Sequence, residues 1–385
     1  MRCLMFNMTG TGTFVEDWAV AATRSAEVLG FSWARARPDS AQPLAASLTM
    51  GEVAGIPVVF VEPPIRLRPK RLARRVNDRL EIRKMIRAVR FLEQRYGPIE
   101  LLHSHFYAGS GAIPGLAKRL GLQFVHTEHS TRLLGDRKLA RAGRAVLKQV
   151  MGQAAVVMFV SDEQLDFVRG QGVDGRFVVV PNPVDDRLFR VGHGGYPDEI
   201  RLITVGHLLP RKRHALLLSA VAQARKADSR IRLDVVGAGA CRVDLEVQSV
   251  RLGLGSVVRF WGHADRGQVA FLLAQSDIYV HTSETETFGV AIVEALFSGL
   301  PVVVAAAGGV TRTIPASMGV TVNHPDPDIF AAAIVDVVNR LGTFKRETIA
   351  AESRQMFSAS SVALRLGHIY EEALEREPQH RSMAP

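Results

Sequence analysis

The chain has 385 residues, 47% of them hydrophobic and 22% charged, with a formal net charge of +10 at pH 7. This length favours two domains, and the apolar fraction is that of a soluble globular protein. No apolar run approaches the roughly 20 residues that a membrane helix requires, and residues 1–6 are too few for a signal peptide, so we expect a cytoplasmic location. The two cysteines, Cys3 and Cys241, lack metal-type spacing, which argues against a disulfide framework or a zinc site.

Short apolar runs alternate with helical stretches almost throughout the chain, and the pattern restarts once. This alternation predicts two doubly wound, Rossmann-like α/β domains with parallel sheets. Two prolines in the segment 181–185 place the boundary, giving an N-terminal domain 1–183 and a C-terminal domain 184–352. A last helix, 353–374, is expected to pack back towards the N-terminal domain, ahead of a tail, 375–385. The predicted strands are 1–7, 58–61, 101–105, 123–127, 156–160 and 177–180, then 201–206, 231–237, 257–261, 278–282, 301–305 and 319–322.

Positive charge is concentrated in two stretches. Between Arg66 and Arg90 there are eleven basic residues and two acidic ones, and residues 132–148 are a second basic stretch. An anionic membrane, nucleic acid or a phosphate-rich substrate would attract such charge, and a solvated helix face is the plain alternative. Because no recognised nucleic-acid motif interrupts the stretch, we expect no nucleic acid and retain peripheral contact with the inner membrane face.

Two glutamates, Glu286 and Glu294, stand eight positions apart across a predicted strand, loop and helix (278–282, 283–289 and 290–297). Glu294 is the only charge in that apolar helix, where a carboxylate is costly unless a polar ligand hydrogen-bonds it. Glu286 precedes the helix N-terminus, whose free N–H groups and dipole favour a phosphate. The spacing indicates a shared sugar- and phosphate-binding turn; a capping glutamate with a buried ion pair is the alternative.

Two further turns follow predicted strands of the second domain. The turn that begins at Gly206 carries Arg211, Lys212 and Arg213, so it offers positive charge and close backbone approach to a diphosphate, although an ordinary basic turn has the same composition. The second turn contains Gly237-x-Gly239, which superficially matches a dinucleotide fingerprint. Its third glycine is absent, so a nicotinamide-dependent oxidoreductase is only a minor alternative.

Histidines end two predicted strands of the first domain: His103 and His105 on one, and His126 and His129, followed by Ser130, on the next. Ligands of open parallel sheets bind beyond the carboxyl ends of the strands, so these residues are expected to line a cleft between the domains. We expect no metal there, because alternate strand positions point to opposite faces and no carboxylate spacing completes a site.

Loop 9–13 and the turn at Asp326 are two further segments that could bind a ligand. The glycine- and hydroxyl-rich loop 9–13 is either a substrate contact or a plain connection. Asp326 and Asp328 flank a proline ahead of a helix, which fits turn and cap chemistry better than a metal site.

Together these residues resemble a retaining glycosyltransferase of family 4, with the GT-B double-Rossmann architecture, over most of the chain. The most specific element is Glu286-x7-Glu294, followed by Gly299-Leu300-Pro301-Val302. The Gly206 turn with Lys212, the hinge at 181–185 and the strand end at His129 occur in the order of that family.

The resemblance implies roles for individual residues. Glu286 and the amides of Phe288, Gly289 and Val290 would hold the donor sugar and phosphate, Glu294 the ribose and Lys212 the diphosphate, while His129 contacts the donor sugar. The expected catalytic residues are Glu286, His129 and Lys212, the further donor-binding residues are Gly206, His207, Arg211 and Gly237, and the acceptor or first-loop candidates are Gly10, Thr11, Gly12, Ser130 and His105.

The implied reaction moves a hexosyl group from a UDP- or GDP-linked donor to an unidentified acceptor, with retention and without metal or cofactor, in bacterial glycoconjugate, polysaccharide or natural-product biosynthesis. Two departures leave alternatives open. His207 stands where the family usually has arginine, and Gly10-Thr11-Gly12 replaces its usual glycine pair. A degenerate binding or scaffold protein, or a sugar-nucleotide epimerase or hydrolase, would fit the same architecture.

Overall fold

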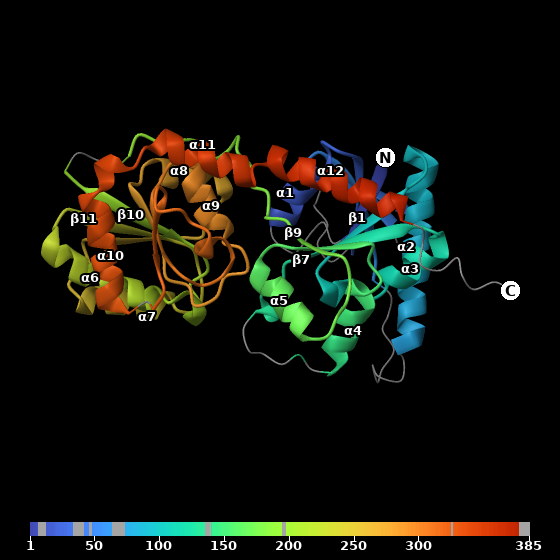
Figure 1. Cartoon of the computed structure of the whole chain (residues 1–385), viewed down its shortest axis with the longest axis horizontal. Helices are drawn as coiled ribbons and strands as arrows, with labels where there is room; N and C mark the ends of the chain where they lie inside the picture. The colour runs from blue at the N-terminus through green and yellow to red at the C-terminus, as the bar shows by residue number, and fades with distance from the viewer. Residues whose placement is uncertain are drawn as a thin grey trace. The chain divides into compact units, whose positions relative to one another are not determined.

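The computed structural model describes residues 1–6, 13–33, 42–45, 48–63, 74–134, 139, 141–194, 198–324 and 326–376. The chain divides into two compact units (Figure 1): unit 1 is Met1–Pro183 with Ala359–Pro385, and unit 2 is Val184–Ser358. Each unit is an α/β domain built on its own sheet. No helix in the described ranges is long and apolar enough to cross a membrane.

Unit 1 contains a nine-stranded sheet in the order β3-β4-β5-β2-β1-β6-β7-β8-β9. Its strands are β1 (Arg2–Phe6), β2 (Glu27–Trp33), β3 (Gln42–Ala45), β4 (Leu48–Val53), β5 (Ile56–Val61), β6 (Leu101–His105), β7 (Gln123–Glu128), β8 (Val156–Phe159) and β9 (Phe177–Val179). All neighbours from β5 to β9 in this order are parallel, whereas β3 and β4 extend the sheet antiparallel to β5. The sequence pattern did not predict β2, β3 or β4.

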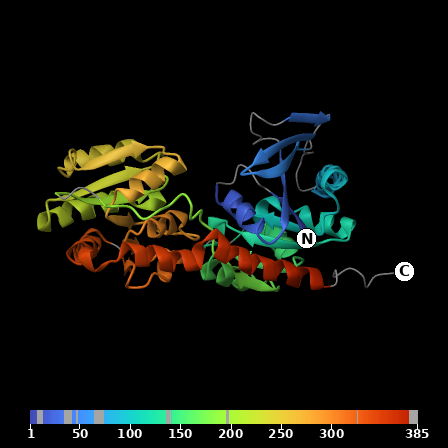
Figure 2. The same ribbon diagram turned by 90° about the horizontal axis from the view of Figure 1, so that it is seen from above.

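The helices of unit 1 are α1 (Thr13–Ala22), α2 (Arg74–Tyr96), α3 (Ile113–Leu120), α4 (Arg141–Met151), α5 (Asp162–Gly170) and α12 (Ala359–Glu375). Helix α12, red in Figures 1 and 2, contacts α1 and β7, so the end of the chain belongs to the first unit. The expected single helix 353–374 is divided in two, because Ser358 adopts an extended backbone between α11 (Arg346–Phe357) and α12.

Unit 2 has a six-stranded, all-parallel sheet in the order β12-β11-β10-β13-β14-β15. Its strands are β10 (Ile200–Val205), β11 (Ile231–Val236), β12 (Val258–Gly262), β13 (Ile278–His281), β14 (Val302–Ala305) and β15 (Gly319–Val322). Besides α11, its helices are α6 (His214–Ala227), α7 (Arg242–Arg251), α8 (Arg266–Ala274), α9 (Val290–Phe297) and α10 (Pro327–Asn339). The strand order reverses between β10 and β13, and such switch points are where open α/β sheets bind ligands.

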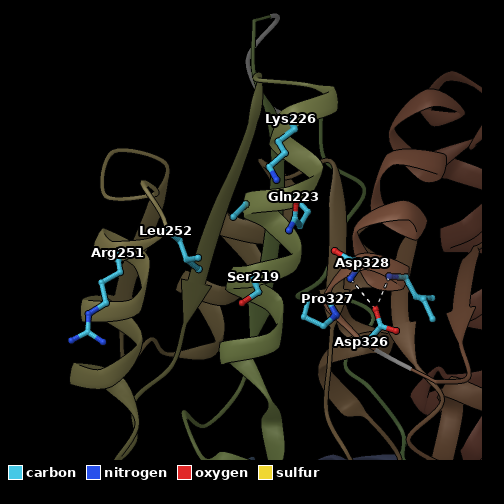
Figure 3. Close-up of a pocket in the computed structure, with 10 residues that line it drawn as sticks. Ser219, Gln223, Lys226, Arg251, Leu252, Asp326, Pro327 and Asp328 are labelled. Atoms are coloured by element: carbon cyan, nitrogen blue, oxygen red, sulfur yellow. Dashed lines mark hydrogen bonds between the residues drawn. The ribbon is translucent and has the colours of Figure 1, made fainter.

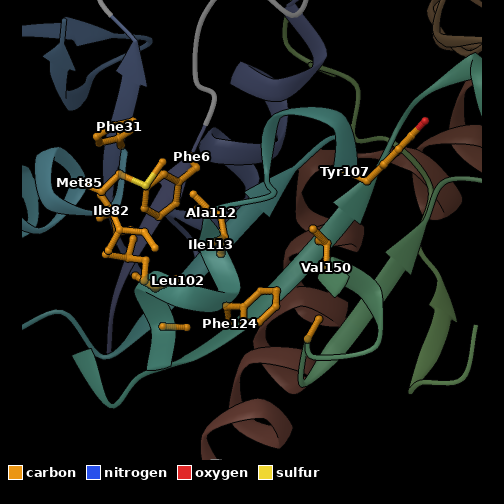
Figure 4. Close-up of a cluster of buried hydrophobic side chains, with 14 of the residues drawn as sticks. Phe6, Phe31, Ile82, Met85, Leu102, Tyr107, Ala112, Ile113, Phe124 and Val150 are labelled. Atoms are coloured by element: carbon orange, nitrogen blue, oxygen red, sulfur yellow. The ribbon is translucent and has the colours of Figure 1, made fainter. Parts of the chain in front are cut away.

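Continuous apolar strands explain why both sheets form. The Cys3–Phe6 part of β1 and all of β8 and β14 are buried, as expected for parallel strands covered on both faces. In unit 1 the core brings together side chains such as Phe6, Ile113 and Phe124 (Figure 4). Tyr107 belongs to the same core, but its hydroxyl points away from the cluster.

The two ends of unit 2 lie side by side. The Val184 N–H donates to the Phe357 carbonyl over 3.0 Å, and Val184 and Ser358 form an isolated parallel bridge. The chain therefore enters and leaves unit 2 at adjacent points.

Candidate functional site

Two of the predicted donor residues of unit 2, Lys212 and Glu286, meet at the switch point between β10 and β13. After β10, a 3-10 turn (Pro210–Lys212) carries Lys212, and after β13 the chain loops back to Glu286. The Lys212 ammonium forms an ion pair with Glu286 Oε1, and both side chains are largely buried, at 13% and 12% exposed. The Thr282 hydroxyl donates to the Lys212 carbonyl over 3.0 Å, which fixes one loop against the other. Residues 74 positions apart in the sequence are thus held together.

A buried histidine, His281, also holds Glu286. Its Nε2 lies 3.1 Å from Glu286 Oε1, and its Nδ1 lies 3.5 Å from the hydroxyl of Tyr279. Burial raises the pKa of the Glu286 carboxyl, but the hydrogen bond and charge of His281, together with the charge of Lys212, outweigh it and lower the pKa to about 2. Glu286 is therefore an anion across the physiological pH range. We call Lys212, Tyr279, His281 and Glu286 the Glu286 cluster; Tyr279 and His281 were not among the predicted site residues.

Helix α9 begins directly after this cluster. Its N-cap is Gly289, with φ +97°, so the cap residue has no side chain that could accept from the first N–H groups of the helix. Gly289 and Val290 are partly exposed, whereas Phe288 is buried. The Phe288 carbonyl accepts from the Val310 N–H over 2.8 Å, which holds the turn in place. The capping part of the alternative interpretation of Glu286 is therefore wrong, whereas its ion pair is present.

Glu294 lies on α9 among buried apolar residues and is itself 8% exposed. Its Oε1 is 3.8 Å from a guanidinium nitrogen of Arg266, the first residue of α8. Arg266 was not predicted, because nothing in its local sequence indicates a ligand. The pair is long enough that a hydrogen-bonding ligand could compete for the carboxylate.

The basic side chains of the turn after β10 point to different partners. Lys212 points to Glu286, whereas Arg213 pairs with the exposed Glu284 over 3.0 Å. Arg211 is half-buried and has no ion pair with any described residue, and His207 is exposed. Of the predicted cations, only Lys212 is built into the Glu286 cluster.

The two glycines after β11 have a packing role. Gly237 has φ +141°, and a Cβ there would lie 1.9 Å from the Gly206 carbonyl oxygen; one on Gly239 would lie 2.3 Å from the Leu208 carbonyl oxygen. Both glycines let this turn close onto the Gly206 turn, which explains the Gly-x-Gly pair without a dinucleotide. A Cβ at Gly206 itself would meet nothing within 4 Å.

In unit 1 the predicted histidines gather at the carboxyl ends of β6 and β7. His105 Nδ1 lies 2.9 Å from His129 Nε2, and the edge of Trp18 packs against His103, His105 and His129 at centroid distances of 6.1, 6.1 and 5.8 Å. Trp18 Nε1 donates over 2.7 Å to Asn182 in the predicted hinge. The sequence could not pair these two residues.

The imidazoles of His103, His105 and His129 are uncharged at neutral pH. Burial, with the neighbouring His126, lowers the pKa of His129 to about 3, against a weaker opposing hydrogen bond with Asn182. Burial likewise lowers the pKa of His103 and of His105 well below the ordinary value. Neutral imidazoles can donate and accept hydrogen bonds, which suits contact with hydroxyl groups.

Glu128, which the sequence analysis did not single out, organises this strand end. It is fully buried; its Oε2 accepts from the Tyr107 N–H over 2.9 Å, and its Oε1 accepts from the His129 and Ser130 N–H groups over 3.0 and 2.8 Å. The Ser130 hydroxyl accepts from the Arg132 N–H over 3.2 Å, so it caps a 3-10 turn. The predicted loop residues Gly10, Thr11 and Gly12 lie outside the described residues.

Asp326 and Asp328 line a pocket of unit 2 that contains no residue of the Glu286 cluster. No group of three or more His, Cys, Asp or Glu residues in the described ranges is placed to hold a metal ion. Asp326 Oδ1 accepts from the N–H groups of Asp328 and Ile329, 2.9 Å each, so it caps α10 as expected (Figure 3). An open pocket of about 760 Å³ beside this cap is lined from α6, α7 and α10 and contains none of the predicted donor residues.

Two α/β units, each with its own mainly parallel sheet, are the GT-B architecture of nucleotide-sugar glycosyltransferases, and the family models assign the chain to this class. Residues 8–188 match the Glycosyltransferase Family 4 domain, and residues 185–355 match the glycosyl transferases group 1 domain. The chain belongs to glycosyltransferase family 4.

Relatives agree with this assignment. The chain is 31% identical over 310 residues to D-inositol 3-phosphate glycosyltransferase 2 of Catenulispora acidiphila, covering 72% of each protein. It is 31% identical over 293 residues to the D-inositol 3-phosphate glycosyltransferase of Geodermatophilus obscurus, covering 69% of this chain and 64% of that protein.

Solved structures share the fold. Sucrose-phosphate synthase from Thermosynechococcus elongatus matches with a TM-score of 0.73 and 19% identity, over 97% of this chain and 98% of that one. The Anabaena protein HepE, in complex with UDP and glucose, matches with a TM-score of 0.72 and 18% identity, over 96% and 99%. At these identities the likeness concerns the fold alone.

Proposed function

We propose that this glycosyltransferase moves a hexosyl group from a UDP- or GDP-linked donor to an acceptor hydroxyl, with retention of anomeric configuration and without a metal ion. The observation that carries the proposal is the meeting of Lys212, Glu286 and the α9 N-terminus at one switch point. A diphosphate needs the cation and the helix amides, and a sugar needs an ionised carboxylate that accepts from its hydroxyls.

The donor roles divide among the described groups. Lys212 exchanges its contact with Glu286 for the diphosphate, and the Gly289 and Val290 amides bind phosphate oxygens. Glu286 accepts from sugar hydroxyls, and Glu294 accepts from the ribose in place of the long contact with Arg266. The open side of Gly206 admits the nucleotide close to the backbone, while Gly237 holds that turn in place.

Catalysis then depends on orientation and fixed charge. The bond from the anomeric carbon to the diphosphate breaks, and the negative charge that develops on the departing diphosphate is stabilised by Lys212 and the positive end of α9. The acceptor oxygen forms the new bond on the same face of the sugar, and its proton passes to the leaving phosphate. His129, neutral in unit 1, is proposed to contact the donor sugar through a hydrogen bond.

A thermal-shift screen of UDP, GDP, UDP-glucose and GDP-mannose tests the donor. A ligand that binds the folded protein raises the melting temperature by an amount that grows with the ratio of its concentration to its Kd, so we expect one nucleotide pair to give the largest shift. No shift with any of the four and no turnover would contradict the proposal. NMR of the product from an α-linked donor should show an α-anomeric proton, and EDTA should leave the rate unchanged.

The same assay separates the alternatives. A scaffold protein would bind a nucleotide without turnover, and an epimerase or hydrolase would convert the donor with no acceptor present. Candidate acceptors should include an inositol phosphate, since the Catenulispora relative is named for that acceptor.

We also propose that the protein is cytoplasmic and touches an anionic membrane surface through unit 1. Arg79, Arg83, Arg87 and Arg90 lie on α2, three or four positions apart, so they form a row along one face. The opposite face of the helix is buried in the core. The residues from 64 to 73, including Arg66, lie outside the described ranges.

Sedimentation with vesicles containing phosphatidylserine tests the membrane proposal. Binding should be strong at low salt and weaken as salt rises, because the attraction is electrostatic. The variant with Arg79, Arg83, Arg87 and Arg90 changed to Gln should stay in the supernatant. Equal sedimentation of the two proteins would show that the row is only a solvated face.

A further inference from the structure

The Glu286 carboxylate has two donors that differ in how firmly they are held. Both reach Oε1: the Lys212 ammonium from a loop after β10, and His281 Nε2, at 3.1 Å, from the last residue of β13. No described residue donates a hydrogen bond to Oε2. One carboxylate oxygen is therefore anchored within the protein, and the other is available to a ligand.

The His281 ring is fixed from its other side as well. The Tyr279 hydroxyl lies 3.5 Å from His281 Nδ1 and 3.4 Å from the Val205 carbonyl oxygen, and the two rings are stacked at 6.1 Å. An ionised carboxylate only accepts hydrogen bonds, so His281 Nε2 must carry the proton that faces Glu286. His281 is buried and is the last residue of β13, so its position is set by the sheet.

Donor binding, as proposed above, removes only one of these two contacts. If Lys212 turns to the diphosphate, Glu286 loses its adjacent cation, and a buried carboxylate without a donor takes up a proton. A protonated Glu286 would be a weaker acceptor for sugar hydroxyls. The titratable groups that act on Glu286 are Lys212 after β10 and Tyr279 and His281 on β13; His214, at the start of α6, acts on Lys212 and His281, and Glu294 of α9 acts on Tyr279. Apart from Lys212, His281 is the one described residue whose side chain donates a hydrogen bond to Glu286.

We propose that His281 is a positioning residue that keeps Glu286 ionised and aimed at the sugar once Lys212 has turned to the donor phosphates. This role rests on the proposed function. Its physical core, that His281 holds the charge of Glu286 when Lys212 is absent, can be tested without any ligand.

The ligand-free test uses Lys212→Met to mimic the departed lysine. His281 is changed to Leu, which removes the N–H, or to Gln, which keeps one; neither side chain titrates, so their difference reports on the hydrogen bond. In the Lys212→Met background, Leu at 281 should raise the pKa of Glu286 above its unfolded value. Stability should then fall as the pH rises from 5 to 7.5, because Glu286 must ionise without a donor.

We expect a drop in melting temperature of roughly 3 °C or more between these pH values for Lys212→Met with His281→Leu, relative to Lys212→Met with His281→Gln. Adding Glu286→Gln to both should abolish the difference. The proposal is overturned if the melting temperatures of the His281→Leu and His281→Gln proteins, both with Lys212→Met, depend on pH in the same way. It is also overturned if their difference in pH dependence persists after Glu286→Gln.

A second measurement connects this role to transfer. With UDP-glucose as the probe, His281→Leu in the otherwise native chain should lower kcat/KM by ~10- to 100-fold, because the substituted protein loses a hydrogen bond that orients Glu286. The acidic limb of its pH profile should move to higher pH, His281→Gln should recover most of the activity, and UDP alone should bind as before. If the acidic limb of the pH profile does not move, His281 supports the fold only and does not set the ionisation of Glu286. A wild-type protein that neither binds nor uses UDP-glucose would contradict that donor and leave the ligand-free result standing.

Discussion

Lys212 and Glu286 form a largely buried ion pair, and both are residues that the donor is proposed to engage. The pair joins the loop after β10 to the loop after β13, so a donor bound as proposed would replace a contact within unit 2. Replacing the Lys212–Glu286 ion pair costs little free energy if the diphosphate pairs with Lys212 as strongly as the Glu286 carboxylate does. The replacement therefore favours ligands that have both a phosphate and sugar hydroxyls.

Replacing Lys212 with Met should therefore weaken the binding of UDP by ~10- to 100-fold, because a charge-assisted contact to the diphosphate is lost. Isothermal titration calorimetry measures the change. Arg213→Met is the matched control, since Arg213 lies in the same turn but pairs with the exposed Glu284. Equal losses in the two proteins would assign the effect to the general charge of the turn.

Gly237→Ala should disrupt the turn that positions Gly206. A Cβ at residue 237 would overlap the Gly206 carbonyl oxygen, and the backbone φ of +141° is unfavourable for alanine. We expect unfolding to become easier by ~2 kcal/mol or more, as measured by urea denaturation. Gly342→Ala, where an added Cβ meets nothing within 4 Å, is the control and should change stability little.

Glu128→Gln should loosen the strand end that holds His129. The amide has one acceptor oxygen where the carboxylate has two, so at least one of the three backbone N–H groups loses its partner. The expected loss of unfolding free energy is about 1–3 kcal/mol. Glu371→Gln, on the exposed face of α12, should be neutral in the same urea titration; a neutral Glu128→Gln would show that the three bonds contribute nothing.

The stability of the protein should fall in mild acid because of the histidines in unit 1. In the folded protein the His129 imidazole stays unprotonated down to about pH 3, because its pKa is lowered. In the unfolded chain the same imidazole takes up a proton below its ordinary pKa of 6.5. The folded state is therefore favoured above pH 6.5 and loses stability as the pH falls towards 3. His129 alone should account for ~2 kcal/mol between pH 7 and 5.

Urea titrations at the two pH values measure this loss, and His129→Asn should reduce it. An unchanged pH dependence in His129→Asn would mean that the other buried groups set the acid limit.

The sequence predicted most of the strands because parallel strands covered on both faces are short, continuous apolar runs that can be recognised without knowing their partners. It missed β2, in which Gly30 and Ser32 interrupt the run, and the polar β4, which pairs antiparallel with β5. The positions of Lys212, Glu286 and Glu294 followed from motif spacing.

Their neighbours did not follow from motifs. His281 could have been found from its place two residues after Tyr279 at a strand end. The contact of Trp18 with Asn182 joins residues 164 positions apart, and no local pattern contains it. Glu128 was visible in the sequence, but its role depends on backbone N–H groups from two strand ends.

The bridge between Val184 and Ser358 makes unit 2 an insertion within unit 1 in the topological sense, with its first and last residues in contact. Such a segment can be excised or replaced as one continuous fragment. The fragment 184–358 begins and ends at one point of its own surface, and a short linker from residue 183 to residue 359 would rejoin what remains. The Glu286 cluster would belong to the excised fragment and the histidines to the rejoined remainder, so two cuts would separate the two clusters.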